Sequence, residues 1–552
     1  MRLSAYCFGL ALALVMPHGA QSQGAGVEWP TYGGDHGASR FSKLDQITTT
    51  NVSRLAPAWV FQAGNDPQGL QSTPIVVDGV MYVSTNQSAI YALDPSSGKV
   101  IWEYRYNVTD PRIEDNRMVA RSRGVAVGHG LVFVGTFDNR VVAVDQETGE
   151  EVWRVRVQDP VQCGCNINAA PLVVKDLVVV GGTGGDNAQR GSISAFDAKT
   201  GRLSWRFYVI PAPGEPGNET WPEGDAWKYG GGAPWMTGSY DPELDLIYWG
   251  TGNAAPDLDS AARPGDNLYT ASVVALDADT GKLRWHYQEV PHDVWDYDSA
   301  FECILADLPV RGRTRKLLIH PTKTGYVWVL DRTNGEFIGA WPMVEDINWV
   351  AGITEDGKLV GRNEPVIDEA TNICPSVFGA KNWNQATFSP QSRLLYVPVM
   401  RICNDMYVRR QEPKPGRQYI SGFWKLKLAP GRKSPSGIAA FDPISGEKKW
   451  EYPYRYLIQS SVLSTAGGLV FAGTDDGEFF ALDANSGEKL WSFQTGGGHR
   501  GSSIAYRIDD RQYVATPSGS PNGGPRRLFP ELGKTPSHGA TLFVFALPEG
   551  DQ

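Results

Sequence analysis

The sequence predicts an all-β fold, a β-propeller of four-stranded blades, on three observations. The frame Ala-apolar-Asp-x-x-x-Gly-x-x-x-Trp recurs along the chain. Most copies follow one another at intervals of 41–54 residues, and one propeller blade occupies about 40–50 residues. The 62 Gly, 37 Pro and 18 Trp among 552 residues suit short strands that are joined by tight turns and anchored by aromatic side chains.

Seven segments carry the frame, and each reads as a strand, a tight turn and a second strand. The motif aspartates are Asp94, Asp145, Asp197, Asp277, Asp331, Asp442 and Asp483. The motif glycine supplies the positive φ that such a turn needs, and the tryptophan can pack between neighbouring sheets. The fifth segment has Gly339 where the tryptophan is expected. The regular Asp and Trp residues are therefore expected to build the scaffold, and function is expected where the repeat is interrupted.

Two intervals between motifs are longer than one blade. The 80-residue interval leaves room for an insertion, which the Gly- and Pro-rich residues 210–232 supply. The 111-residue interval is expected to hold two blades, one with a degraded motif, and residues 386–399 supply a strand pair for it. Seven visible motifs and this hidden blade make eight.

The chain termini carry the two halves of one further motif. Phe545-Ala546-Leu547 resembles its first half and Trp59-Val60-Phe61 its second half. Pairing of the last strand with the first would close the ring and unite them. The split motif adds a ninth blade unless it belongs to one already counted.

The N-terminus has the features of a secretory signal. Met1-Arg2 is followed by an apolar run from Phe8 to Met16 and by Ala20-Gln21-Ser22. We expect residues 1–22 to be the signal peptide and residues 23–552 to be a single propeller domain in the periplasm. No other segment is apolar over the roughly 18 residues needed to span a membrane. The net charge of −10 argues against a nucleic-acid partner.

Export permits disulfides. Five cysteines follow the predicted signal, namely Cys163, Cys165, Cys303, Cys374 and Cys403. The odd number leaves at least one thiol unpaired or paired outside the chain. Cys163-Gly-Cys165 is a candidate local pair, either structural or redox-active.

Four polar segments interrupt the pattern where only turns are expected. They are Gly182–Asp186, Gly250–Asn253, Trp295–Asp298 and His320–Lys323. Three acids and an amide from different blades suit a hard cation, which prefers carboxylate and carbonyl oxygens. No Cys/His spacing typical of zinc, no Gly-x-Ser-x-Gly elbow and no phosphate loop occurs in the sequence.

At these segments the chain resembles the PQQ-dependent alcohol dehydrogenases, the quinoproteins that include methanol and ethanol dehydrogenases. The shared segments are Trp29–Asp35, Gly230–Trp235, Asp241–Asp245, Gly250–Asn253, His292–Tyr297 and Lys381–Asn384. The resemblance runs from about Trp29 to the C-terminus. It implies an eight-bladed ring with the quinone near its axis. It also implies oxidation of an alcohol to an aldehyde or ketone, by metal-assisted hydride transfer to the quinone.

The resemblance also assigns roles to individual residues. Trp235 is expected to be the floor on which the quinone stacks, and Arg123 to pair with a PQQ carboxylate. Further cofactor contacts are expected at Asn168, Thr183, Gly184, Gly185, Lys323 and Asn382. The expected metal ligands are Asp186, Asn253, Asp296 and Asp298, with Asp296 also the catalytic base. Cys374 and Cys403 match a disulfide of the family.

Asp298 bears on the identity of the metal. In this family, an acid two positions beyond the catalytic aspartate marks the lanthanide-using branch, whereas calcium enzymes usually have a small or uncharged residue there. An added carboxylate suits a trivalent ion, because it supplies both charge and a coordination site. We therefore expect a lanthanide, and otherwise Ca²⁺.

Three positions depart from the family pattern. Asp186 stands where the family has a metal-binding glutamate, and its side chain is one methylene shorter. Gln71 stands where the family has an acidic cofactor contact. Arg117-Met118-Val119 stands where the family has a disulfide between adjacent cysteines over the quinone, so that face must be covered differently.

The expected partners are a small-molecule alcohol and an electron acceptor. The sequence has no Cys-x-x-Cys-His haem motif, so electrons are expected to pass to a separate periplasmic cytochrome c. Two alternatives remain: a sugar or polyol dehydrogenase that uses the same cofactor, and a non-catalytic propeller scaffold of the outer-membrane assembly type. The sequence leaves the substrate and the oligomeric state open, a homodimer included.

Overall fold

The computed structural model describes residues 28–550, except for 65, 67, 109, 114–119, 520–523 and 535–538. The predicted signal peptide (residues 1–22) and the segment Arg117-Met118-Val119 lie outside the described residues. Within them, no helix has the length and apolar character needed to cross a membrane.

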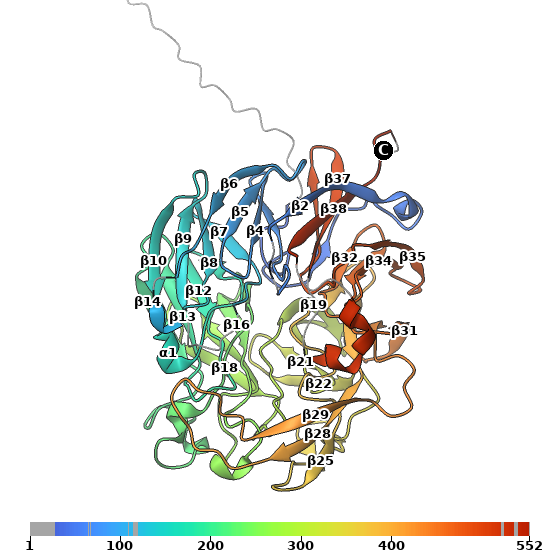
Figure 1. The fold of residues 1–552 in the computed structure, drawn as a ribbon. Helices are drawn as coiled ribbons and strands as arrows, with labels where there is room; N and C mark the ends of the chain where they lie inside the picture. The colour runs from blue at the N-terminus through green and yellow to red at the C-terminus, as the bar shows by residue number, and fades with distance from the viewer. Residues whose placement is uncertain are drawn as a thin grey trace, which may run out of the picture.

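The described strands form a β-propeller (Figure 1). Eight antiparallel sheets have four strands each, and one of these gains a short fifth strand, β1 (Phe41–Ser42), which pairs in parallel with β32. The first two sheets are formed by β3 (Ile75–Val77), β4 (Val80–Ser84), β5 (Ile90–Leu93) and β6 (Val100–Tyr104), and by β7 (Val125–Gly128), β8 (Leu131–Gly135), β9 (Arg140–Asp145) and β10 (Glu151–Arg156). The third and fourth are formed by β11 (Leu172–Val174), β12 (Leu177–Gly181), β13 (Ser192–Asp197) and β14 (Leu203–Tyr208), and by β15 (Ser239–Asp241), β16 (Leu246–Gly250), β17 (Ser272–Asp277) and β18 (Leu283–Gln288). The fifth is formed by β19 (Ile304–Val310), β20 (Arg313–Pro321), β21 (Tyr326–Asp331) and β22 (Phe337–Pro342). The last three are formed by β26 (Thr387–Ser389), β27 (Leu394–Met400), β30 (Ser436–Phe441) and β31 (Lys448–Tyr454); β32 (Leu463–Thr465), β33 (Leu469–Gly473), β34 (Glu478–Asp483) and β35 (Lys489–Gln494); and β36 (Ile504–Ile508), β37 (Arg511–Ser518), β38 (Thr541–Ala546) and β2 (Ala56–Gln62).

The remaining elements are short. Two small sheets are formed by β23 (Gly352–Ile353) with β24 (Leu359–Val360), and by β25 (Ala370–Ile373), β28 (Ile402–Val408) and β29 (Gly422–Leu428). The helical segments are α1 (Pro160–Cys163) and the 3₁₀ turns η1 (Val52–Arg54), η2 (Pro111–Ile113), η3 (Asn218–Thr220), η4 (Ala226–Tyr229), η5 (Ser260–Ala262), η6 (Pro525–Leu528) and η7 (Pro530–Lys534). The all-β prediction is therefore confirmed.

A tryptophan on the outermost strand of each blade joins that blade to the next. Trp102, for example, donates its indole N–H to the carbonyl of Gln146, which directly follows the next motif aspartate (3.0 Å). The same bond is made by Trp59, Trp153, Trp205, Trp285, Trp341, Trp450 and Trp491, at 3.0–3.2 Å. The last of them ends on Leu55, directly before β2, so the eight bonds run around the whole ring.

The motif glycine serves the same contact. A Cβ on Gly149 would lie 2.6 Å from the ring of Trp102 in the preceding blade, and the residue has a φ of +74°. Glycine is therefore required for two reasons: the turn needs a positive φ, and the indole lies too close for a Cβ. The motif combines the turn of one blade with the docking surface for its neighbour.

The fifth segment keeps this contact by a different residue. Gly339 occupies the expected tryptophan position, but Trp341, two residues along the same strand, donates to the carbonyl of Pro443. Residues two apart on a strand point to the same face. The docking side chain is thus displaced along the strand, and the motif there is shifted, not lost.

The ring has eight blades, but the predicted hidden blade is wrong. β26 and β27 join β30 and β31, so residues 386–399 belong to the blade that carries Asp442. The rest of the 111-residue interval forms the two small sheets. The eighth blade is the one split between the termini, where β2 pairs antiparallel with β38, from Ala56 opposite Ala546 to Gln62 opposite Thr541 (Figure 1). The insertion predicted at 210–232 is confirmed, since it connects β14 with β15 through η3 and η4.

Two kinds of loop emerge on the same face of the ring. Within an antiparallel blade, the first strand begins at the end where the second strand stops. Loops that enter first strands and loops that leave second strands therefore meet on one face. Most of the predicted site residues lie in these loops.

The cysteines divide into two disulfides and a buried thiol. Cys374–Cys403 is formed as predicted, with an S–S distance of 2.06 Å, and Cys163 bonds to Cys165. Cys303 is the free cysteine of the described residues and is buried.

Loop length predicts that the two disulfides differ in their contribution to stability. Cys374 and Cys403 are 29 residues apart, whereas Cys163 and Cys165 are two apart. Chain entropy then assigns about 3.5 kcal/mol to the first crosslink and roughly 1.5 kcal/mol to the second. We expect Cys374→Ser/Cys403→Ser to lower the unfolding free energy by more than twice as much as Cys163→Ser/Cys165→Ser in guanidinium titrations. An equal or larger loss for the short-range pair would contradict this reasoning.

Candidate cofactor and metal site

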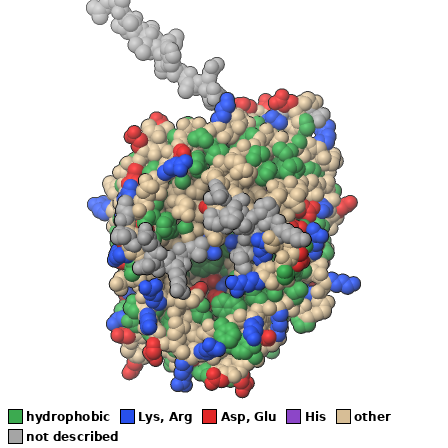
Figure 2. Space-filling view, in the orientation of Figure 1, with side chains coloured by type: hydrophobic (Ala, Val, Ile, Leu, Met, Phe, Trp, Pro, Cys, Tyr) green, Lys and Arg blue, Asp and Glu red, His purple; other side chains and the backbone are tan. Residues whose placement is uncertain are grey.

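The site is built from loops of several blades on one face of the ring. Asp186, Asn253 and Lys323 follow the second strands β12, β16 and β20. Arg123, Trp235, Asp296 and Asp298 precede the first strands β7, β15 and β19. Figure 2 shows charged side chains of both signs spread over the molecular surface, with a hollow near the centre of the face in view.

A tight turn presents Asp296 and Asp298. The buried Asp293 accepts hydrogen bonds from the backbone N–H groups of Trp295 (3.1 Å) and Tyr297 (3.0 Å). Asp296 has a φ of +62°, a left-handed conformation that is uncommon for aspartate. Strained backbone of this kind is concentrated at functional sites.

Lys323 lies between the two acids of this turn. Its Nζ is 2.9 Å from Asp296 Oδ1 and 2.7 Å from Asp298 Oδ2, and it also donates to the Asp296 carbonyl at 2.8 Å. Burial alone would lower the pKa of Lys323, but the charges of Asp296 and Asp298 raise it above its ordinary value. The lysine is therefore a fixed positive charge.

Asp298 also binds the predicted cofactor floor. Its Oδ1 accepts from the Trp235 indole N–H and from the backbone N–H of Asn253, each at 3.1 Å. A Cβ on Gly252 would lie 2.7 Å from the same oxygen, so this approach requires a glycine. Asp298 thus connects the carboxylate cluster to Trp235, a contact that the sequence did not predict.

Asp186 completes the predicted acidic set. Its side chain is exposed, yet burial of the carboxyl by the surrounding protein and the charge of Asp298 raise its pKa. The amide of Asn253 lies next to it, and Asn253 Oδ1 is buried with no hydrogen-bond partner among the described residues.

A fourth buried acid, Asp257, belongs to the same cluster. Burial raises the pKa of Asp257 well above its usual range, and the charges of Asp186 and Asp296 raise it further. Burial likewise raises the pKa of Asp296. When all six groups are ionised, the carboxylates of Asp186, Asp257, Asp296 and Asp298 outnumber the two neighbouring cations, which are Lys323 beside Asp296 and Asp298 and Arg263 beside Asp257. The cluster therefore favours added positive charge.

The chemistry of these donors fits an oxygen-preferring cation. Within the described ranges, no group of three or more His, Cys, Asp or Glu side chains could hold a metal ion by itself. Asp186, Asp296 and Asp298 therefore do not converge into a three-acid metal group among the described residues, where Lys323 lies between Asp296 and Asp298. The unpartnered amide oxygen of Asn253 is a further oxygen donor beside them. Carboxylates with an amide oxygen are ligands that calcium and other hard cations accept.

Arg123 lies over the ring of Trp235. Its guanidinium carbon is 5.1 Å from the centroid of the Trp235 ring and 4.7 Å from that of Trp383. Its Nε and Nη1 are buried without partners among the described residues. Burial lowers the pKa of Arg123 to about 9, and the nearby Arg121 contributes. A buried guanidinium with free donors fits a planar anion, and a carboxylate best of all.

Two further arginines, which the sequence did not single out, accompany Arg123. Burial and the charge of Arg121 lower the pKa of Arg500 to about 9. The Nε atoms of Arg121 and Arg500 also lack partners in the described part of the chain. Arg121 could have been predicted from the sequence, because it lies two residues before Arg123 and residues two apart in an extended chain face the same side. Arg500 lies directly before the last blade, and no sequence pattern around it indicates that it belongs to the site.

The other predicted cofactor contacts surround this space. Gln71 is buried, its Oε1 lacks a partner among described atoms, and Thr73 in the same loop donates to the Arg123 carbonyl (2.8 Å). The backbone carbonyl of Asn168 accepts a hydrogen bond from the backbone N–H of Arg123 (2.8 Å). The side-chain Oδ1 of Asn168 also has no partner among the described residues. Asn382 bonds to Phe378 and to Trp383, so its contact with Arg123 is indirect, through the Trp383 ring.

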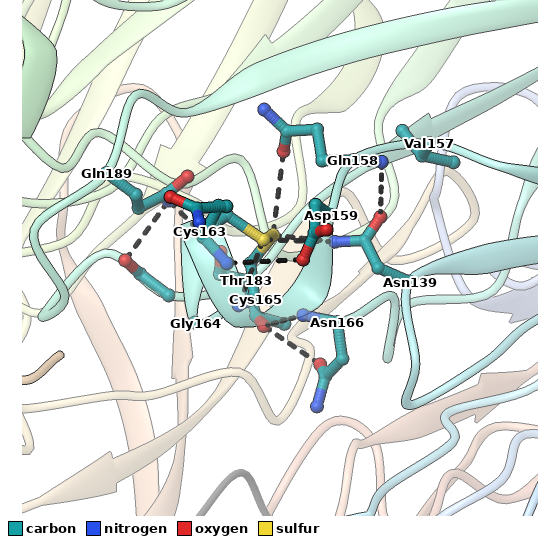
Figure 3. Close-up of a disulfide and its surroundings, with 12 residues drawn as sticks. Asn139, Val157, Gln158, Asp159, Cys163, Gly164, Cys165, Asn166, Thr183 and Gln189 are labelled. Atoms are coloured by element: carbon teal, nitrogen blue, oxygen red, sulfur yellow. Dashed lines mark hydrogen bonds between the residues drawn. A yellow bond between two sulfur atoms is a disulfide. The ribbon is translucent and has the colours of Figure 1, made fainter. Parts of the chain in front are cut away.

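The Cys163–Cys165 disulfide lies against the loop of Thr183, Gly184 and Gly185 (Figure 3). The backbone N–H of Asn166 donates to Thr183 Oγ1 and that of Thr183 donates to the Asn166 carbonyl, both at 2.9 Å. A Cβ on Gly184 would lie 3.0 Å from the Gly164 carbonyl oxygen, and one on Gly185 would lie 2.7 Å from Asn253 Oδ1. The disulfide therefore supports a loop of the predicted site, which the sequence alone did not indicate.

Comparison with known proteins gives consistent matches over most of the chain. The family model "Glucose/ethanol/alcohol dehydrogenase, beta-propeller domain", named PQQ, matches residues 29–349 and 455–514. A quinohemoprotein alcohol dehydrogenase of Comamonas testosteroni is 38% identical over 523 residues, which are 89% of this chain and 72% of that protein.

Two lanthanide-related proteins are also similar. A lanthanide-dependent methanol dehydrogenase of Methylorubrum extorquens is 34% identical over 563 residues, covering 93% of each chain. A solved structure of a europium-containing methanol dehydrogenase superposes with a TM-score of 0.88 at 33% identity, over 94% of this chain and 98% of that one.

Proposed function

The chain belongs to the PQQ-dependent alcohol dehydrogenases, and from this premise we propose that it oxidises an alcohol to an aldehyde or ketone in the periplasm. The observation that carries the proposal is the opposite charge of two groups that meet at Trp235. Arginines with unpartnered donors lie by its ring, with Arg123 over it, and a cluster of carboxylates begins at its indole N–H, which donates to Asp298. A flat anion that stacks on Trp235 would satisfy the first, and a metal ion the second.

PQQ has the chemistry that the arginine side requires. It is planar and carries three carboxylates, and Arg121, Arg123 and Arg500 supply buried guanidinium donors. The indole of Trp235, half-buried and fixed by its bond to Asp298, supplies a flat surface. Asn168, Thr183, Gly184 and Gly185 would then border the cofactor, with Gln71 in place of an acid beside Arg123.

The carboxylate side would hold the metal through Asp186, Asn253, Asp296 and Asp298. When bound, PQQ supplies the hydride acceptor and the metal supplies Lewis acidity. Asp296 would remove the hydroxyl proton of the alcohol. Lys323, which stays charged beside Asp296, would stabilise negative charge that develops in the site.

The charge of the cluster supports a trivalent ion. Asp298 adds a carboxylate to a set that would otherwise suit Ca²⁺, and the added negative charge favours a trivalent ion. Electrons would leave to a cytochrome c, the acceptor named for a similar methanol dehydrogenase of Paracoccus denitrificans.

Asp296→Ala is expected to abolish proton removal while the fold survives. General-base catalysis contributes about 10²–10⁴-fold, so kcat with PQQ and metal present should fall by at least that factor. Asp279→Asn, at an exposed acid of a motif turn, is the matched control and should keep full activity. Circular dichroism and PQQ absorbance would verify folding and loading. Undiminished turnover by Asp296→Ala with PQQ bound would contradict the assignment.

Asp298 is expected to decide which metal supports activity. With PQQ present, lanthanum should activate the unchanged protein and calcium alone should not. Asp298→Asn keeps the side-chain shape but removes one negative charge, so activation by lanthanum should fall at least about tenfold. The assay would cover primary, secondary and sugar alcohols, which also identifies the substrate class. Full activity of the unchanged protein with calcium alone would overturn the trivalent assignment.

A further inference from the structure

Asp257 makes a direct contact with the predicted metal ligand Asn253. It lies in the connection between β16 and β17, four residues after Asn253, and is fully buried. Its Oδ1 accepts a hydrogen bond from Asn253 Nδ2 at 3.0 Å. The backbone beside it is fixed, because Arg263 donates to the carbonyls of Pro256 (3.0 Å) and Asp257 (3.3 Å).

This contact determines which way the Asn253 amide faces. Nδ2 has a second acceptor at the carbonyl of Ala254 (3.4 Å), so two oxygens lie on the same side of the amide. A flipped amide would bring its own oxygen against both of them, and neither could donate to it as a carboxylate or carbonyl. The NH₂ group must therefore face Asp257.

The opposite end of the amide, Oδ1, then faces Gly185, next to the predicted ligand Asp186. Asn253 Oδ1 is buried, has no hydrogen-bond partner among the described residues, and lies 2.7 Å from where a Cβ of Gly185 would be. Gly185 directly precedes Asp186 in the chain. A buried oxygen without a donor costs free energy unless something binds it.

We propose that Asp257 is a positioning residue of the metal site, which holds the Asn253 amide so that Oδ1 is presented to a bound cation. This inference rests on the proposed function. Groups that orient a ligand in this way typically change metal affinity by about 10–100-fold when they are removed. The essential feature of Asp257 is its acceptor oxygen, beyond the charge that it adds to the cluster.

The test is a titration of the PQQ-loaded protein with Tb³⁺, followed by terbium luminescence. Trp235, bonded to Asp298, places an indole at the cluster as the sensitiser. Asp257→Leu should weaken binding by about 10–100-fold, whereas Asp257→Asn, which retains an acceptor oxygen, should lose less. Asp259→Leu is the matched control: Asp259 is buried in the same connection but bonds to Ala261 instead of Asn253, so its loss should leave the affinity unchanged.

A double-mutant cycle separates orientation from general destabilisation. In an Asn253→Ala background, Asp257→Leu should cause no further loss of affinity. Near-ultraviolet circular dichroism would confirm folding, and Asp257→Ala would replace a leucine variant that does not fold.

Three results would overturn the inference. The first is unchanged Tb³⁺ affinity in Asp257→Leu, and the second is an equal loss in Asp257→Asn and Asp257→Leu. The third is a full additional loss in the Asn253→Ala background. Failure of the unchanged protein to bind Tb³⁺ would instead overturn the proposed metal site, and this inference with it.

Discussion

Closure of the ring is the constraint on which the rest of the structure depends. The apolar faces of a blade stay exposed unless neighbouring blades cover them, and a ring is complete only when the last blade meets the first. Here the strand β38 from the C-terminal end pairs with β2 from the N-terminal end to complete the last blade, and Trp491 of the preceding blade donates to the Leu55 carbonyl beside β2. Together with the other seven indole bonds, this contact fixes each blade relative to its neighbours. Loops from distant parts of the sequence are thereby held together on one face.

The site exploits this rigidity by holding unfavourable charges in place. Arg123 and Arg500 are buried near each other, Asp296 and Asp298 are buried around a single lysine, and Asp257 is buried near Asp296. Burial first, and like charges second, lower the pKa of the two arginines and raise the pKa of Asp257 and Asp296. A scaffold without ligands would gain nothing from this arrangement. An anionic cofactor and a cation would neutralise the two groups separately, with Trp235 between them.

The sequence predicted the features that depend on local pattern. The repeat identified the propeller, and the interruptions at Asp186, Asn253, Asp296 and Lys323 identified residues that the fold brings together. The prediction of a hidden blade failed because it rested on motif spacing, which does not reveal how strands pair. The 111-residue interval holds small inserted sheets instead. The sequence also missed residues whose role depends on a distant neighbour. Trp341 was overlooked because its motif is shifted by two positions, and Arg500 because only the folded ring places it beside Arg123. Asp257 is only four residues from Asn253, but the sequence does not show that the loop turns its carboxylate onto that amide.

The most direct test of the account is a crystal structure of the chain with PQQ and lanthanum, with the ion located by its anomalous scattering. We predict one strong peak at about 2.3–2.6 Å from oxygens of Asp186, Asn253, Asp296 and Asp298. PQQ should stack on Trp235 with a carboxylate on Arg123. A peak away from these oxygens, or PQQ bound elsewhere than on Trp235, would contradict the account.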